Sequence, residues 1–226
     1  MIDISKIPVI AIDGPSGSGK GTVAELVAQA LGFHYLDSGA IYRGAAFAAR
    51  KAGVDFSDRA GLAVLAQNLP LRFENSEIWL NNELVSEEIR SEQAGEDASK
   101  IASIPALREA LLARQRAFLQ LPGLVADGRD MGSVVFPQAD LKIFLTASAE
   151  ARAERRTKQL KQKGIHVRIP DVLKDLKQRD DRDSSRVTAP LRQLQDARLL
   201  DTSDLTVDQA VKQVLKWYRE KHEFSH

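Results

Sequence analysis

The residues best suited to phosphate chemistry lie together near the N-terminus, in the loop GPSGSGKGT. Its glycines allow the backbone to fold tightly, so that successive N–H groups point inward around an anion. Lys20 adds a full positive charge, and a helix that begins near Gly21 directs the positive end of its dipole toward the same place. The loop therefore predicts a cradle for a nucleoside triphosphate. The residues expected to line it are Gly14, Pro15, Ser16, Gly17, Ser18, Gly19, Lys20, Gly21 and Thr22.

The flanks of the loop favour this interpretation over an ordinary flexible turn between a strand and a helix. The apolar run Val9–Ile12 precedes the loop, and VAELVAQAL follows it with apolar residues at helical spacing. One position departs from the general pattern, because Gly21 stands where many such loops carry the serine or threonine that binds Mg²⁺. Thr22 follows one place later.

Two further polar segments follow predicted strands. In DSGAIYR, Ser38 is a suitable helix N-cap, and Arg43 lies where its guanidinium could bind a phosphate through two hydrogen bonds. In the second segment, Asp127 ends an apolar strand, which is a usual place for an aspartate that holds Mg²⁺ through water. A turn before the next glycine is the alternative role for Asp127. Arg129 and Asp130 would then face the phosphate acceptor.

Basic residues gather in two predicted helices of the second half of the chain. One helix face carries four charged residues at helical spacing: Arg179, Arg182, Asp183 and Arg186. This pattern suits either a solvated helix with ion pairs or a lid whose arginines neutralise phosphates when it closes. The helix expected at about 149–162 has the same two interpretations. If it is part of a lid, Arg155 or Arg156 would lie against the adenine or the phosphates of the nucleotide.

Alternating strands and helices must position these residues. We expect strands at about 8–13, 34–37, 123–127, 141–147 and 197–203, and helices at about 20–31, 39–52, 105–120, 149–162, 171–186 and from 206. This alternation predicts an α/β fold with a parallel sheet covered by helices on both faces. The segment 60–100 carries short alternating runs instead, which predict an antiparallel meander in an inserted lobe. Because ligands bind at the carboxyl ends of parallel strands, segments 14–22, 37–43 and 127–130 should converge.

The composition excludes several other classes of protein. The 226 residues carry a net charge of +1, which argues against a broad nucleic-acid-binding surface. Without cysteine, disulfides, thiol catalysis and cysteine-ligated zinc are excluded, and the four histidines show no metal-ligand spacing. We find neither an apolar run of about 18 residues nor a signal-peptide pattern, so we expect a cytoplasmic protein with no membrane partner.

Taken together, the motifs resemble the bacterial cytidylate kinases, the CMP/dCMP kinase branch of the nucleoside monophosphate kinases, for which the GKGT form of the loop is typical. The matching segments are GPSGSGKGT, LDSGAIYR, ADGRDMG, VVFP, KIFL and RDDRD with the arginine and APL that follow it, in this order across nearly the whole chain. The resemblance implies a P-loop NTPase-type three-layer α/β/α fold with a parallel five-stranded sheet. Its parts would be a core (about 1–59, 101–156 and 187–226), a monophosphate-binding lobe (about 60–100) and a lid (about 157–186).

The same resemblance implies roles for individual residues. Eight would bind the acceptor CMP, with Ser99, Arg108 and Asp130 at the cytosine, Asp183 at the ribose, Arg43, Arg129 and Arg186 at the phosphate, and Ser38 beside them. The catalytic residues would be Lys20, Arg129, Arg179 and Arg186. Arg155 would join the glycine-rich loop in binding ATP, and Asp127 would hold Mg²⁺ through water.

The implied activity is the direct in-line transfer of the γ-phosphoryl group of ATP to CMP or dCMP, assisted by Mg²⁺. The expected partners are these nucleotides, with no nucleic acid polymer, and we expect a monomer. From the residues alone, the prediction reaches only a P-loop phosphotransferase with an arginine-rich lid. A kinase for another small acceptor stays an alternative, and so does a nucleotide-hydrolysing switch protein, although the chain lacks the Asn-Lys-x-Asp segment that a GTP-reading switch would need.

Overall fold

The computed structural model describes residues 6–74 and 77–223, and the chain divides into two units. The first unit consists of Met1–Leu36 and Phe118–His226, and the second of Asp37–Ala117. In the first unit the strands are β1 (Val9–Asp13), β2 (His34–Asp37, whose last residue opens the second unit), β6 (Leu124–Gly128), β7 (Leu141–Thr146) and β8 (Arg198–Asp201). Its helices are α1 (Lys20–Leu31), the π-helix η2 (Met131–Val135), α7 (Ala149–Gln162), α8 (Ile169–Ser185) and α9 (Val207–Glu223).

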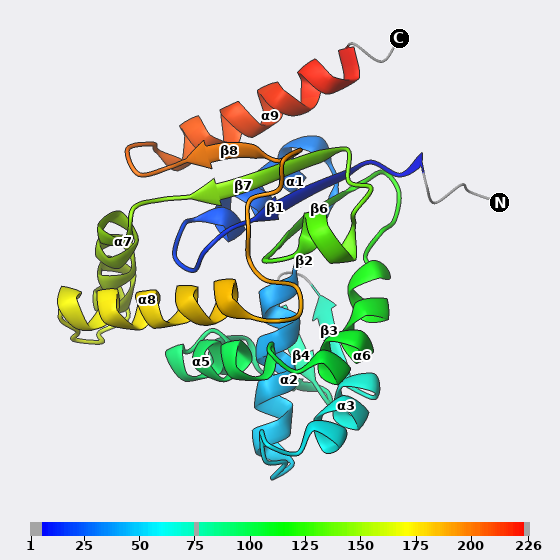
Figure 1. Cartoon of the computed structure of the whole chain (residues 1–226), viewed down its shortest axis with the longest axis vertical. Helices are drawn as coiled ribbons and strands as arrows, with labels where there is room; N and C mark the ends of the chain where they lie inside the picture. The colour runs from blue at the N-terminus through cyan, green and yellow to red at the C-terminus, as the bar shows by residue number, and fades with distance from the viewer. Residues whose placement is uncertain (1–5, 75–76, 224–226) are drawn as a thin grey trace. The chain divides into compact units, whose positions relative to one another are not determined.

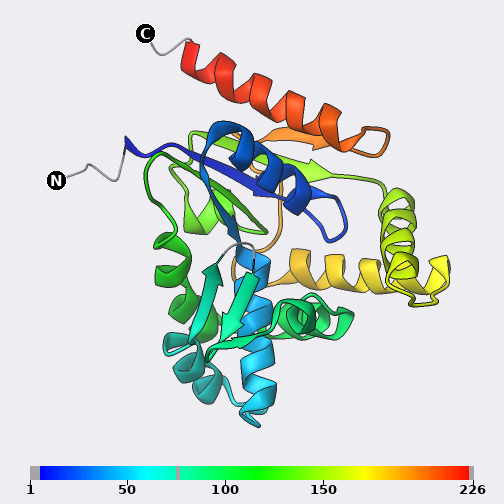
Figure 2. The same cartoon turned by 180° about the vertical axis from the view of Figure 1, so that it is seen from behind.

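These strands form the predicted five-stranded sheet, in the order β2-β6-β1-β7-β8. β1 pairs in parallel with both β6 and β7, and β7 pairs in parallel with β8, which confirms the α/β fold class (Figure 1). β1 is buried along its whole length, as expected for a central strand of a parallel sheet. Val23 and Val27 of α1 pack with Ala210 and Val214 of α9 in one apolar cluster with the strands, so both helices cover the same face of the sheet (Figure 2).

The register of the central strands brings the polar segments of this unit together. Ile12 is paired with Asp127, and Asp13 with Gly128, so β1 and β6 end side by side. β7 ends beside them, with Phe144 opposite Asp13. The glycine-rich loop after β1, the Arg129–Asp130 segment after β6 and the start of α7 after β7 therefore leave the sheet at one edge. The expected convergence of segments 14–22 and 127–130 is confirmed.

The second unit contains helices as well as the predicted meander. Its elements are α2 (Ser38–Lys51), α3 (Arg59–Gln67), β3 (Leu71–Glu74), β4 (Glu77–Leu80), β5 (Glu83–Leu84), α4 (Ser86–Ile89), α5 (Glu92–Ile101) and α6 (Pro105–Arg116). The antiparallel sheet β3-β4-β5 confirms the meander, and α2 packs on α5 and α3 on α6 (Figures 1 and 2). This unit is thus wider than the lobe expected at 60–100, because α2 and α6 pack with its helices.

The helices α3 and α5, which lie on either side of this meander, were not predicted from the sequence. α3 and α5 both begin at capping side chains, since Asp58 accepts from the backbone N–H of Gly61 at 2.8 Å and Ser91 from that of Ala94 at 3.2 Å. Asp58 and Ser91 are residue types typical of N-caps, and they were the sequence signal for the starts of these two helices. In the described ranges no helix is long and apolar enough to cross a membrane.

Candidate active site

The glycine-rich loop has the backbone geometry that a phosphate cradle requires. Gly17 and Gly19 have φ angles of 75° and 90°, in the left-handed region that favours glycine. Any Cβ on Gly14 would lie 2.0 Å from the carbonyl oxygen of Leu145, so a larger residue cannot replace it without movement of β7. The buried Lys20 opens α1 and its Nζ donates to the carbonyl of Pro15 at 3.4 Å. The loop is held in a folded shape with the Lys20 ammonium group beside it.

Two carbonyls of the loop are bound by three side chains from two other segments. Arg152 of α7 donates to the carbonyl of Ser16 at 3.0 Å. Arg155 of the same helix and Thr202 after β8 donate to the carbonyl of Ser18, at 3.4 Å and 3.1 Å respectively. The predicted ATP-binding residue Arg155 therefore lies directly against the glycine-rich loop.

Asp127 lies against the first turn of α1, which bears on the expected magnesium ion. A Cβ on Gly21 would lie only 3.1 Å from Oδ2 of Asp127, and the hydroxyl of Tyr35 donates to this oxygen at 3.0 Å. The carboxylate thus takes up the space that a serine or threonine side chain after Lys20 would need, which explains the departure from the usual motif. Mg²⁺ is commonly held by one or two carboxylates together with substrate phosphates, and the buried Asp127 fits that requirement.

Arg129 connects the glycine-rich loop to α8. Its Nη2 donates to Oγ of Ser16 at 2.8 Å, and its Nε pairs with Oδ2 of Asp183 at 2.8 Å. Burial works against the charge of Arg129, but Asp183, helped by Asp127 and Asp180, raises the pKa of the guanidinium above its ordinary value. Burial likewise opposes ionisation of Asp183, yet Arg129, Arg186 and Lys20 hold the pKa of that carboxyl below its usual range. Both side chains are therefore charged at neutral pH.

Asp13 is a buried carboxylate at this edge that sequence reasoning missed. It accepts hydrogen bonds from the backbone N–H groups of Met131 and Gly132, at 2.8 Å and 2.9 Å. Desolvation raises the pKa of Asp13 to about 7, although these two hydrogen bonds act in the opposite direction. Asp130, the residue directly before Met131, is also buried. The signal for Asp13 was a lone aspartate at the end of an otherwise apolar strand.

The end of α8 carries the remaining predicted arginines. Arg179 and Arg182 are half-buried, and Arg186 closes the helix and donates to the carbonyl of Ala189 at 2.9 Å. Ala189 has a φ of 51°, an unusual conformation for a residue other than glycine. The backbone N–H of Leu191 donates to the carbonyl of Asp183 at 2.8 Å. The chain after α8 thus folds back on the turn that holds Asp183.

In the second unit, the two residues at the start of α2 have different partners. The N-cap of α2 is Asp37, which accepts from the backbone N–H of Ala40 at 2.8 Å, so the assignment of this role to Ser38 was wrong. Ser38 is buried and instead donates to Oε1 of Gln115 at 2.8 Å. Arg43 pairs with Asp37 at 2.7 Å. The hydroxyl of Ser38 is therefore oriented by a buried amide.

Ser99 and Arg108 of this unit also have distinctive surroundings. The guanidinium of Arg108 is buried, donates to the carbonyl of Ala102 at 3.0 Å and lies 5.5 Å from the centre of the Tyr42 ring. The Oγ atom of Ser99 is buried with no hydrogen-bond partner among the described residues. A buried hydroxyl without a partner is costly, and a bound ligand could supply the missing hydrogen bond.

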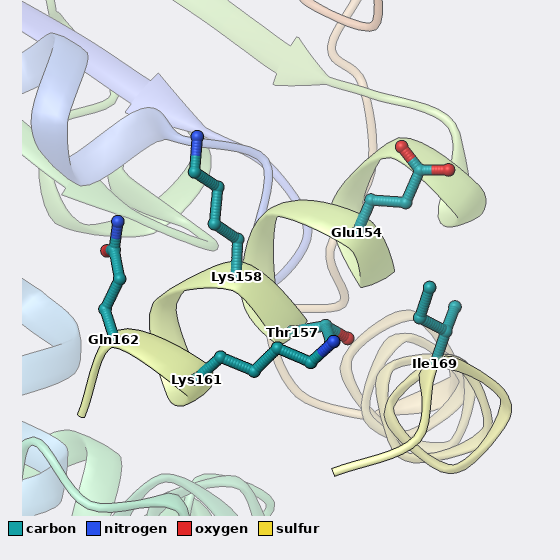
Figure 3. A pocket seen from close by; sticks show the side chains of 6 residues that line it. All are labelled: Glu154, Thr157, Lys158, Lys161, Gln162 and Ile169. Carbon is teal, nitrogen blue, oxygen red and sulfur yellow. The ribbon is translucent and has the colours of Figure 1, made fainter. Parts of the chain in front are cut away.

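A groove of about 470 Å³ lies along α7 beside the start of α8 (Figure 3). Its lining residues are Glu154, Thr157, Lys158, Lys161, Gln162 and Ile169. None of the predicted site residues is among them. This groove is therefore separate from the site built around the glycine-rich loop.

Comparisons with known proteins show the family of this chain. The sequence model of the cytidylate kinase family matches residues 10–220. The chain is 58% identical to the cytidylate kinase of Polynucleobacter asymbioticus, over 96% of this chain and 98% of that protein. It is 57% identical to the cytidylate kinase of Nitrosomonas europaea, over 97% and 98% of the two chains. Since the match spans the loop, the Arg129 segment and α8 alike, the chain belongs to the cytidylate kinase family.

Proposed function

We propose that this chain transfers the γ-phosphoryl group of ATP to CMP or dCMP. One observation carries the proposal: Ser16 in the glycine-rich loop is bound by Arg129, which is paired with Asp183 of α8. This contact joins the donor-binding loop to two of the residues expected to bind CMP. Family membership gives the acceptor its identity, because the relatives with about the same length are cytidylate kinases.

Catalysis would consist of positioning and charge stabilisation. An ionised phosphate of CMP is already a nucleophile, so the in-line attack requires no general base. Lys20 and the N–H groups at the start of α1 would stabilise negative charge on the transferring group, and Arg129 would add a second cation. Asp127 would hold Mg²⁺ through water, and the ion would neutralise charge on the phosphate oxygens.

For the acceptor, we infer that CMP is bound by the residues to which the resemblance to cytidylate kinases assigns this role. The buried, unpartnered Oγ of Ser99 and the buried guanidinium of Arg108 suit recognition of a cytosine ring. Asp130 would accept from the exocyclic amine of cytosine, and Arg43 would bind the phosphate. The proposed lobe (about 60–100) would belong to the second unit, and the proposed lid (about 157–186) would include α8 with Arg179 and Asp183, and Arg186 after it.

The function is tested by measuring ADP release from Mg·ATP with CMP, dCMP, UMP, AMP, GMP or no acceptor in parallel. We expect strong release only with CMP and dCMP. Equal release without any acceptor would overturn the kinase assignment in favour of a nucleotide hydrolase. Stimulation by AMP or GMP alone would retain the phosphotransferase and replace the acceptor.

A further inference from the structure

Arg152 is the most buried of the three arginines of α7, and neither the sequence motifs nor the proposed mechanism gives it a role. Its side chain is only 7% exposed. Nε donates to the carbonyl of Ala147 at 3.1 Å, and Nη1 donates to the carbonyl of Ser16 at 3.0 Å. Nη1 also pairs with Oδ2 of Asp180 on α8 at 2.7 Å. One guanidinium therefore joins three separate segments of the first unit.

The contact with Ser16 matters because of how the glycine-rich loop binds anions. When its N–H groups point inward around a phosphate, its carbonyls point outward and must find other donors. Arg152 supplies such a donor at Ser16, directly before Gly17, whose φ of 75° makes the turn. A Cβ on Gly17 would lie 3.5 Å from the Cβ of Arg152, so the α7 backbone also packs against this turn.

The same residue, Ser16, is linked twice to α8. Arg152 holds its carbonyl and pairs with Asp180, while Arg129 holds its hydroxyl and pairs with Asp183, three residues further along the helix. The second oxygen of Asp180, Oδ1, is buried with no hydrogen-bond partner in the part of the chain that the structure describes. Its pairing with Arg152 is thus the main compensation for burial of this carboxylate.

We propose that Arg152 is a positioning residue that keeps the glycine-rich loop in its ATP-binding shape and couples this shape, through Asp180, to the placement of α8. The inference rests on the proposed function, because it takes ATP as the ligand of the loop. Only arginine can fill this role, since its planar fork reaches the carbonyls of Ala147 and Ser16 and the carboxylate together.

The test is ATP binding by calorimetry, without acceptor, to the wild type, Arg152→Lys, Asp180→Asn and the double variant. Arg198→Lys is a matched control, since Arg198 is half-exposed on β8 and pairs with Glu220. Lysine keeps the charge but cannot bridge both carbonyls, so we expect Arg152→Lys to raise the Kd for ATP about tenfold. Asp180→Asn should raise it about threefold, and the double variant should bind like Arg152→Lys, because Asp180 acts through Arg152.

A purely structural role gives a different pattern. A variant that is only destabilised has a lower melting temperature and a smaller fraction of folded, binding-competent molecules, but the folded molecules keep the wild-type Kd for ATP. In turnover, such a variant shows a lower kcat without a higher KM for ATP. An Arg152→Lys Kd within twofold of the wild type overturns the proposal. If that variant does not fold, a wild-type Kd for Asp180→Asn overturns the coupling. CMP-dependent ADP release by the wild type tests the proposed function separately, because it does not depend on these variants.

Discussion

The Oδ1 atom of Asp13 accepts a hydrogen bond from the backbone N–H of Met131 at 2.8 Å, across the ends of two neighbouring strands. Oδ2 accepts a second from Gly132 at 2.9 Å. Asp13 directly precedes the glycine-rich loop, and Met131 directly follows Asp130. The buried carboxylate of Asp13 therefore links the start of the ATP-binding loop to the segment that follows Asp130, which we expect to contact cytosine.

The buried position of Asp13 predicts a pH-dependent stability. Desolvation raises the folded-state pKa to about 7 from 3.8, so between these values the folded protein holds a proton that the unfolded chain has released. The free energy of unfolding should therefore fall as pH rises through this window, by at most about 1.4 kcal/mol per pH unit from this group. Asp13→Asn removes the effect. Urea unfolding between pH 4 and 8 checks it, and a wild-type-minus-variant difference that is independent of pH would contradict it.

The Lys20 side chain should be required for turnover. The ammonium group of Lys20 lies at the start of α1, where we expect it to stabilise the negative charge that develops on the transferring phosphoryl group. Lys20→Ala removes this stabilisation, so we expect the rate of ADP release to fall at least about a hundredfold. Lys216→Ala is a suitable control, because Lys216 is an exposed residue of α9 that pairs with Glu220. Steady-state assays with CMP measure the effect, and thermal melting confirms that the variant is folded. A loss smaller than tenfold would remove Lys20 from the catalytic group.

Asp130 should affect the acceptor and spare the donor. Asp130→Ala removes the carboxylate expected to accept from the cytosine amine, so the KM for CMP should rise by about ten- to a hundredfold. The Kd for ATP, measured without acceptor, should stay within twofold of the wild-type value. Equal weakening of ATP binding in Lys20→Ala and Asp130→Ala would contradict the division into donor and acceptor residues.

The strands and α-helices of the first unit could be predicted because they have strong local signals, whereas the π-helix η2 was not predicted. The apolar run of β1, the glycines of the loop and the periodicity of α1 identify the phosphate cradle, and the structure places them as expected. The role of Arg152 could not be predicted. α7 carries basic residues all around its surface, and the sequence does not show that Arg152 is buried while Lys158 and Lys161 are exposed. The burial of Arg152 depends on tertiary packing of α7 against α8, where Arg152 pairs with Asp180.

Asp13 and the helices α3 and α5 of the second unit were missed for other reasons. An aspartate at the end of a strand fits the general pattern of the loop, so its burial and its two backbone partners become visible only when β6 is paired beside it. α3 and α5 are only 9 and 10 residues long, and isolated helices of this length are marginally stable in water. Their N-caps give the boundary, while packing of α3 on α6 and of α5 on α2 stabilises the helices.

Ser99 offers a test that separates binding from structure. Its buried Oγ has no hydrogen-bond partner among the described residues, so Ser99→Ala removes a desolvation cost and should raise the free energy of unfolding by up to about 1 kcal/mol without ligand. If the hydroxyl binds cytosine, the same variant should raise the KM for CMP about tenfold. Urea unfolding and steady-state kinetics measure the two effects. A variant that is less stable and has an unchanged KM would assign Ser99 to the protein interior instead.

The Tyr35–Asp127 hydrogen bond should set the magnesium requirement. Tyr35→Phe removes the hydroxyl that donates to Oδ2 of Asp127 at 3.0 Å and leaves the packing of the ring unchanged. A carboxylate that loses such an orienting partner typically binds metal about 10- to 100-fold more weakly, so the half-maximal Mg²⁺ concentration for ADP release should rise about tenfold. Asp127→Asn should raise it further, and adding Tyr35→Phe to Asp127→Asn should have no additional effect, because the tyrosine acts through the carboxylate. Titration of Mg²⁺ at fixed ATP and CMP gives the comparison. An unchanged Mg²⁺ requirement in Asp127→Asn would show that the ion is held by the nucleotide phosphates and water without this residue.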